Sequence, residues 1–138
     1  MQRLFISLPS DTSYITALEK FYYTFMDVST ASLTFNEDDI FLSLIEGTVN
    51  GMKHGNKFDI EKKVDIAIAV DGTKIEVIIE DNGDGFEPDR VLDPTSPDRL
   101  PMPGGRGVFL IKKLMDEVHF EFVNGGTRLI MIKFAQKS

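Results

Sequence analysis

Apolar and polar residues follow two different periods along this chain, and the changes of period mark its elements. From Tyr14 to about Val28 the apolar residues recur every three or four positions, which is the spacing of one face of a helix. From Val64 to Val70 they alternate strictly with polar or small residues, which is typical of a strand with one buried face. The sequence therefore predicts helices and strands in separate segments.

The first third of the chain predicts a strand and two helices. Arg3–Leu8 indicates an opening strand, and Ser10 or Asp11 can cap the helix that follows it. Asn36 can cap a second helix, because acidic residues follow it where the helix dipole favours negative charge. We expect this second helix to run to about His54.

Two hairpins are predicted in the remainder. The first joins Val64–Val70 to a strand over Ile75–Ile79 through a two-residue turn at Asp71-Gly72. The second joins Phe120–Val123 to Thr127–Phe134 through a glycine-rich turn.

A proline-rich segment separates the two hairpins. Five of the six prolines lie between Phe86 and Gly104, so this stretch is neither a long helix nor a central strand. Loops of this length in compact domains are lids, binding loops or disordered segments. We expect a lid over about residues 86–104, followed by a helix from Val108 to about Val118.

This order of elements predicts one α+β domain over residues 1–138. A chain of this length can bury a single core. We expect a two-layer sandwich, with one mixed or antiparallel sheet and the helices on one of its faces.

Charge and composition exclude several classes of function. The net charge of −7 argues against general binding to nucleic acid or to anionic membranes, which requires a basic surface. The absence of cysteine excludes disulfides, thiolate metal sites and cysteine nucleophiles. Neither a signal pattern nor an apolar run of membrane-spanning length is present, so we expect a cytoplasmic protein.

The loop after the strand at Ile75–Ile79 is a candidate nucleotide site. Gly83 and Gly85 stand at alternate positions beside Asp81, which lets a flat ligand approach the backbone. A carboxylate in this place can accept a hydrogen bond from an exocyclic amine such as that of adenine. An ordinary surface turn is the alternative, since Asn-Gly and Asp-Gly pairs also mark turns.

The second predicted helix carries a polar stripe. Glu46, Asn50 and His54 are spaced by four, so they share one side of the helix. The apolar residues lie on the opposite side and must pack on the sheet, so the stripe should face away from the sheet. It is either a solvated face or a site in which Asn50 offers an oxygen to a metal, Glu46 a basic carboxylate and Lys53 a charge for phosphate.

Two glycines within this helix indicate a close neighbour. Gly47 and Gly51 each cost about 1 kcal/mol relative to alanine in a helix interior. Since they share one edge of the helix, we expect a ligand or a packed neighbour to approach that edge closely.

A further candidate site lies at Gly104-Gly105-Arg106-Gly107, where a helix begins. Backbone N–H groups at a helix start bind anions well, and glycine leaves them accessible. Arg106 can add charge-assisted hydrogen bonds to a phosphate. A flexible hinge before a helix is the alternative interpretation.

Taken in order, these segments resemble the sequence boxes of the Bergerat-fold ATPases, the superfamily of DNA gyrase and histidine kinases. The boxes are Glu46-x-x-x-Asn50-x-x-Lys53-His54, then Asp81-x-Gly83-x-Gly85, then Gly105-x-Gly107, then Gly126-Thr127. The short chain, the Lys-His-Gly ending of the first box and the Gly-Gly-Arg-Gly-Val-Phe-Leu-Ile of the third are most similar to the bacterial anti-sigma-factor serine kinases of the RsbW and SpoIIAB type.

This resemblance implies an ATP-dependent protein kinase with Mg²⁺ as its metal. It implies that Asn50 holds Mg²⁺ and that Glu46 is the general base for a substrate hydroxyl. The other residues would bind ATP: Lys53, His54, Asp81, Gly83, Gly85, Gly105, Arg106, Gly107 and Thr127.

The resemblance also implies partners. These are a small anti-anti-sigma (STAS-type) domain that is phosphorylated on serine and a sigma factor that is sequestered, and a homodimer is possible. In some relatives an arginine before the third box reaches the terminal phosphate, whereas this chain has Pro103 there. That departure bears on the rate of phosphoryl transfer more than on nucleotide binding. A non-catalytic nucleotide-binding or protein-binding module of the same fold is the alternative.

Overall fold

The computed structural model describes residues 1–82, 105–123 and 125–136. The predicted lid over 86–104, Gly83, Gly85 and Pro103 lie outside the described residues, as does the side chain of Arg106. No helix in the described part of the chain is long and apolar enough to cross a membrane.

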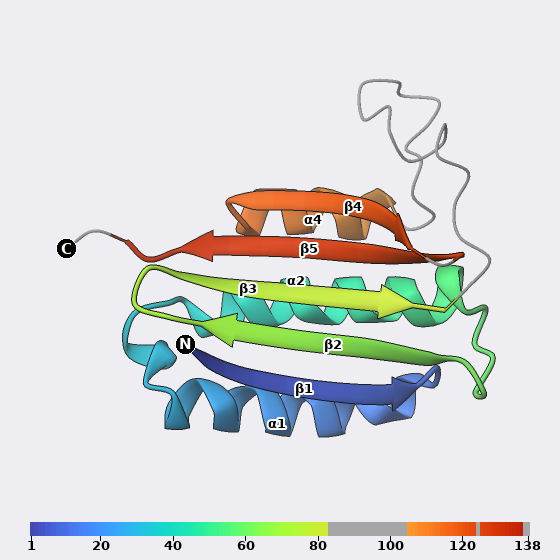
Figure 1. The fold of residues 1–138 in the computed structure, drawn as a ribbon, viewed down its shortest axis with the longest axis horizontal. Helices are drawn as coiled ribbons and strands as arrows, with labels where there is room; N and C mark the ends of the chain where they lie inside the picture. Colours follow the sequence, from blue (N-terminus) through green and yellow to red (C-terminus); the bar gives the residue numbers. More distant parts are fainter. Residues whose placement is uncertain (83–104, 124, 137–138) are drawn as a thin grey trace.

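One five-stranded sheet forms the first layer (Figure 1), and its strand order is β1-β2-β3-β5-β4. Every pair of neighbouring strands is antiparallel. The strands are β1 (Gln2–Pro9), β2 (Lys63–Val70), β3 (Lys74–Asp81), β4 (Glu117–Val123) and β5 (Gly126–Phe134).

The helices form the second layer, on a single face of the sheet (Figure 1). The long helices are α1 (Ile15–Val28), α2 (Glu37–Asn50) and α4 (Gly105–Leu114). Short 3₁₀ turns at Thr12–Tyr14 and Ala31–Leu33 precede α1 and α2 respectively. The α2 helix continues directly into a π-helical turn, η3 (Gly51–Gly55).

The core lies between the two layers and follows from the alternation in the strands. In β2 and β3 every second residue is buried, and the buried residues of both strands face the helices. The helices contribute apolar side chains to this core, among which Leu18, Leu44 and Ile111 are fully buried. The α+β sandwich predicted from the sequence is therefore confirmed.

One predicted element differs from the structure in its helix type, and two differ in their boundaries. The second helix reaches Gly55 as expected, but its last turn is π-helical rather than α-helical. The helix expected over Val108–Val118 begins at Gly105 and ends at Leu114. Val118 belongs to β4, because the antiparallel pairing of β4 with β5 already begins at Glu117, which pairs with Ile132.

The turn between β2 and β3 is held by an aspartate side chain. The Asp71 carboxylate accepts hydrogen bonds from the Thr73 N–H at 2.8 Å, the Thr73 hydroxyl at 2.7 Å and the Lys74 N–H at 3.0 Å. These hydrogen bonds stabilise the charged form and lower the pKa of Asp71 to about 2. The ladder closes at Val70 and Ile75, so the bend is centred on Gly72 and Thr73, one residue later than predicted.

We expect the stability of this hairpin to fall with acidification through the titration of Asp71. Its pKa in the folded state lies below the ordinary value of 3.8, so the stabilisation is complete above about pH 4 and is lost as the pH falls towards about 2. The difference in Tm between the wild type and Asp71→Asn should be largest at neutral pH and shrink over that interval. A difference that is constant from pH 7 to pH 2 would contradict this assignment.

Candidate functional site

Asp81 is the last residue of β3, and its side chain lies on the helix side of the sheet. It is 8% exposed, and its Oδ1 accepts a hydrogen bond from the Thr127 N–H of the neighbouring strand β5 at 3.3 Å. The Thr127 hydroxyl is also buried, and it has no hydrogen-bond partner in the described part of the chain. A buried carboxylate and an unsatisfied hydroxyl side by side are suited to bind a polar ligand.

Glycines surround Asp81 because side chains would not fit there. A Cβ at Gly55, in the π turn, would overlap the Asp81 carboxylate, and a Cβ at Gly126 would overlap the Asp81 carbonyl. A Cβ at Gly51 would lie 3.7 Å from Asp81 Cβ, which is an ordinary contact. The backbones of the π turn at Gly55 and of β5 at Gly126 therefore pack directly against Asp81, with no room for a side chain between them.

Glu46 and Asn50 lie side by side where α4 begins. A Cβ at Gly107 would come within 2.6 Å of Glu46 Oε2 and 3.3 Å of Asn50 Nδ2. Both side chains are half-buried, and Gly107 is buried beneath them. The polar stripe of α2 therefore faces the first turn of α4, where backbone N–H groups suit an anion.

The two helix glycines have packed neighbours, one of the two explanations expected from the sequence. A Cβ at Gly47 would lie 2.6 Å from Ile79 Cδ1 and 2.8 Å from Leu129 Cδ2. The lack of a side chain at this position therefore allows α2 to pack closely on the sheet. Gly51 packs against Val64 and Asp81.

A small cavity connects these groups. It has a volume of about 20 Å³, which is room for about one water molecule. Its polar lining comes from Asn50, Asp81 and Thr127, and its apolar lining includes Phe120 of β4. The sequence-predicted residues Asn50, Asp81 and Thr127 thus meet around one space, although they lie far apart in the chain.

The π turn carries the two remaining predicted residues of the first box. Lys53 is exposed, and His54 is half-buried. Burial lowers the pKa of His54 below its ordinary value, and the neighbouring Lys53 charge acts in the same direction. The exposed Lys53 side chain therefore presents its charge to solvent beside a partly buried imidazole.

Asn56 is a further residue of this region that the sequence patterns did not reveal. It is 1% exposed, and its Nδ2 donates to Ser10 Oγ at 2.9 Å and to the Lys63 carbonyl at 3.1 Å. Its Oδ1 accepts from the Asn82 N–H at 3.0 Å. Asn56 therefore ties the residue after Asp81 to the ends of β1 and β2. Its position directly after Lys-His-Gly is the signal in the sequence that could have indicated it.

Residues 17–133 match the family described as the histidine kinase-like ATPase domain. The chain belongs to this family, which confirms the resemblance found in its sequence boxes. Membership in an ATPase family also implies that the nucleotide is ATP.

Curated relatives with similar sequences are bacterial. The serine-protein kinase RsbW of Bacillus licheniformis is 31% identical over 107 residues, which are 72% of this chain and 66% of that protein. The serine-protein kinase RsbW of Bacillus subtilis is 34% identical over 102 residues, 68% of this chain and 63% of that protein. The chain thus spans just under two thirds of the length of these relatives.

Solved structures support the same fold. The RsbU and RsbW domains of Rv1364c from Mycobacterium tuberculosis superpose with a TM-score of 0.68 at 15% identity, over all of this chain and 34% of that chain. A histidine kinase domain from Erythrobacter litoralis gives a TM-score of 0.53 at 20% identity, over 70% of this chain and 43% of that chain. At these identities the likeness shows the fold alone.

We expect Asn56→Ala to loosen the start of the loop after Asp81. The substitution removes three hydrogen bonds made by a buried side chain, so the free energy of unfolding should fall by about 2–4 kcal/mol. The Asn82 amide should also lose its protection from hydrogen exchange, which NMR measures residue by residue.

Two further variants distinguish a role of Asn56 in positioning Asn82 from a role in stabilising the fold. Asn56→Asp keeps the oxygen that accepts from Asn82 but loses both donated hydrogen bonds, so stability should fall while the Asn82 amide stays protected. Ser10→Ala removes one partner of Asn56 at the far side and should also leave that amide protected. Equal loss of protection in all three variants would show that Asn56 only stabilises the fold.

Proposed function

We propose that this protein is an ATP-dependent serine protein kinase that phosphorylates a small anti-anti-sigma domain of the STAS type and sequesters a sigma factor. The observation that carries the proposal is the pairing of Glu46 and Asn50 against the first turn of α4, beside the cavity lined by Asp81 and Thr127. The names of the RsbW relatives support the same activity.

In this proposal Asp81 and Thr127 recognise the adenine. Asp81 accepts a hydrogen bond from the exocyclic amine, and the unsatisfied Thr127 hydroxyl gains a partner on the ring. Gly83 and Gly85 give the ring access to the backbone. The N–H groups of Gly105 and Gly107, together with Arg106, Lys53 and His54, bind the phosphates.

The residues around Asn50 also suit Mg²⁺. An amide oxygen next to a phosphate-binding helix start is the kind of hard ligand that Mg²⁺ takes together with phosphate oxygens. Asn50 would hold the ion, which neutralises charge on the phosphates when it is bound.

Glu46 is proposed as the general base. The serine hydroxyl oxygen of the partner forms a bond to the γ-phosphorus while the bond from that phosphorus to the ADP oxygen breaks. The hydroxyl proton passes to the Glu46 carboxylate, and ADP leaves with the electron pair of the broken bond. Because Glu46 lies one helical turn before Asn50, both side chains serve the same space.

We further propose that the protein acts in the cytoplasm, where transcription factors are found, and that it works as a homodimer. Its net charge of −7 suits contacts with basic protein surfaces rather than with DNA.

A non-catalytic protein-binding module of the same fold is the second candidate, and one observation favours it. The cavity beside Asp81 has a volume of about 20 Å³, far less than an adenine ring needs. A kinase must therefore open this space to admit ATP, whereas a binding module needs no such change.

Asp81→Asn should weaken ADP binding about 10- to 100-fold, because a charged acceptor is replaced by an amide. The fold should survive, since the amide oxygen can still accept from the Thr127 N–H. Isothermal titration with ADP and Mg²⁺ measures the change, and Asp27→Asn on α1 is a matched control. Absence of any ADP or ATP binding by the wild type at millimolar concentration would favour the binding module.

Glu46→Gln should slow phosphotransfer by about 100-fold or more while ATP affinity changes by less than a few-fold, because shape is kept but the base is lost. Mass spectrometry of a STAS-type partner after incubation with ATP and Mg²⁺ measures the transfer. The matched control Glu37→Gln replaces an acidic residue at the start of the same helix, and it should transfer phosphate at the wild-type rate. Equal rates for Glu46→Gln and the wild type would remove Glu46 from the role of base.

A further inference from the structure

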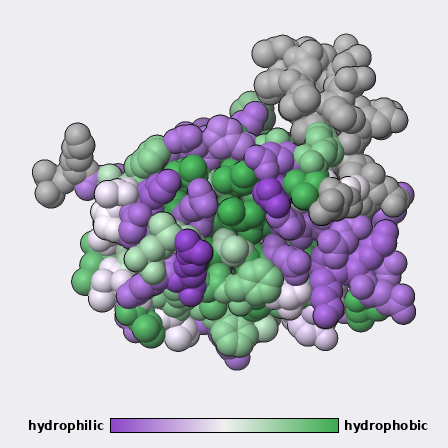
Figure 2. Space-filling view, viewed as in Figure 1, coloured by the Kyte–Doolittle hydropathy of each residue, from purple (hydrophilic) through white to green (hydrophobic). Residues whose placement is uncertain are grey.

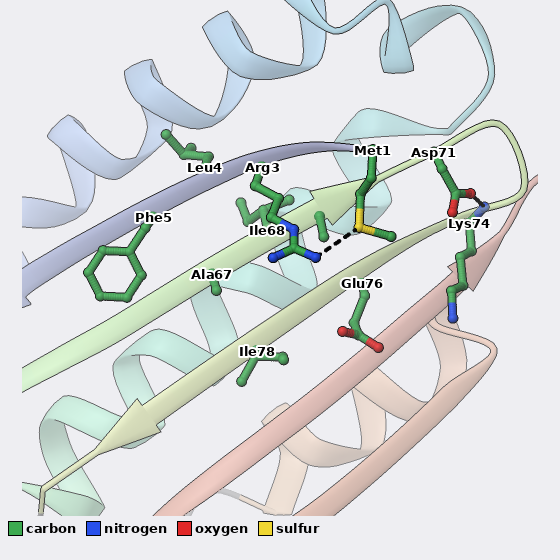
Figure 3. A pocket seen from close by; sticks show the side chains of 11 residues that line it. Met1, Arg3, Leu4, Phe5, Ala67, Ile68, Asp71, Lys74, Glu76 and Ile78 are labelled. Carbon is green, nitrogen blue, oxygen red and sulfur yellow. Dashed lines mark hydrogen bonds between the residues drawn. The ribbon is translucent and has the colours of Figure 1, made fainter.

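Two hollows wide enough for a nucleotide base lie on the sheet face opposite the helices, away from the candidate site. Their volumes are about 430 Å³ and about 350 Å³, and both are bordered by Phe5 and Ile78. Figure 2 shows hydrophobic side chains in the middle of this face, and Figure 3 shows the larger hollow. Asn50, Asp81 and Thr127 line neither hollow. These residues can surround an adenine only if room is made at the cavity of about 20 Å³ that they line themselves.

Most of the residues around this cavity are held in place. Of the eight residues that line it, six are buried, and two, Asn50 and Phe120, are half-buried. Ile79 and Leu129 belong to the sheet beneath α2, and a Cβ at Gly47 of this helix would overlap both of them. Asn50 is already a binding residue of the proposed site. Phe120 is therefore the large lining side chain that is neither held beneath α2 nor required to bind the ligand.

Phe120 lies at the edge of the sheet, where few buried side chains surround it. It belongs to β4, which pairs only with β5, and its partner in the register is Leu129. Figure 1 shows α4 behind this edge of the sheet. There Phe120 and Phe122 pack against Val108 of α4, in a small cluster beside the main core. Local movements require less free energy in such a region than in the centre of the core.

A rotation about χ1 can move the Phe120 ring without any change in the backbone. In strands, χ1 values of about 180° and about −60° are both common, so a second staggered position is accessible to this side chain. Side-chain rotations of this kind are fast compared with the binding of a ligand. The populations of the two positions, rather than the barrier between them, would therefore control access to the cavity.

We propose that the Phe120 ring closes the adenine cavity while no nucleotide is bound and turns out of the cavity to admit the base. This inference rests on the proposed function, since it takes adenine as the ligand of the cavity. In the closed position the ring shields the apolar floor at Ile79 and Leu129 from water. An adenine ring that enters the cavity shields the same surface, so the Phe120 ring is no longer needed there. Phe120 thus determines access to the site and has no part in the transfer of phosphate.

A gate and a fixed wall of the pocket change different rate constants. If only a fraction of the molecules is open, the association rate constant and the affinity both fall in proportion to that fraction. A side chain that forms a fixed wall acts only after the base has bound, and it slows the dissociation of the ligand. The rate constant that a substitution of Phe120 changes therefore identifies its role.

The first test is stopped-flow binding of a fluorescent ADP analogue, with Mg²⁺, to the full chain and its variants. Phe120→Ala removes the ring and should raise the association rate constant tenfold or more. Phe120→Leu keeps more of the packing and should give an intermediate value, which also provides the answer if Phe120→Ala does not fold. Phe120→Trp should lower the association rate constant. Unchanged association with faster dissociation in the smaller variants would indicate a fixed wall and would overturn the proposal.

Phe122→Ala is the matched control. Phe122 lies on the same face of β4 and packs against the same Val108, but it does not line the cavity. Its removal should leave the association rate constant within about twofold of the wild-type value, even where the Tm falls as far as in Phe120→Ala. Equal acceleration in both variants would show that looser packing, rather than an open gate, speeds the binding.

The second test observes the ring itself by fluorine NMR, in protein that carries 4-fluorophenylalanine in place of Phe120. The solvent isotope shift of its resonance should grow when ADP is added, because the ring leaves the cavity for solvent. Saturating adenosine should have the same effect, since the base displaces the ring, whereas inorganic triphosphate should have none. An isotope shift that ADP leaves unchanged, or that triphosphate raises as much as ADP, would overturn the proposal.

The outcomes separate the gate from the proposed kinase function. ADP binding by the wild type, with the same association rate constant in Phe120→Ala, would reject the gate and leave nucleotide binding intact. Absence of ADP binding by both proteins would reject the gate together with the kinase. Binding by Phe120→Ala alone would show that the ring keeps the wild-type cavity closed.

Discussion

The site depends on the close approach of three backbone segments to the carboxylate of Asp81. The end of β3 supplies the carboxylate, β5 supplies the N–H of Thr127, and the π turn supplies Gly55 against the side chain. A buried carboxylate without such donors would lose its charge or destabilise the fold. The requirement for glycine at Gly55 is thus a consequence of the buried acid, whereas Gly126 is required by the main-chain carbonyl of the same residue.

The antiparallel sheet has one face that packs against the helices and one face that is open. Alternation along β3 sends Ile79 and Asp81 to the helix side and Ile78 and Glu80 to the open side. The same eight residues therefore carry part of the core, part of the lining of the cavity beside Asp81 and the middle of the open face. A substitution that shifts the register of β3 by one residue would exchange these surfaces.

Much of the fold could be predicted, because the strands alternate strictly and α1 keeps a single apolar stripe. The limits of α4 could not. Its glycine-rich start has low helix propensity, and its end is set by pairing of Glu117 with Ile132, a contact between distant parts of the chain. In the site, spacing alone predicted that Glu46 and Asn50 share one side of a helix. Spacing did not predict the role of Asn56, which is buried because the ends of three segments meet around it.

The π turn at Gly51–Gly55 also fixes the spacing between the two halves of the site. Its hydrogen bond runs from the Asn56 N–H to the Gly51 carbonyl at 2.8 Å, so this turn holds one residue more than an α-helical turn. Removing one residue here would restore α-helical winding and rotate everything that follows by about 100°. Gly55 would then leave Asp81, although Asn50 would stay in place. The length of this segment is therefore as restricted as its composition, and a single-residue deletion in it would disrupt the packing around Asp81 without disturbing the helix that carries Glu46 and Asn50.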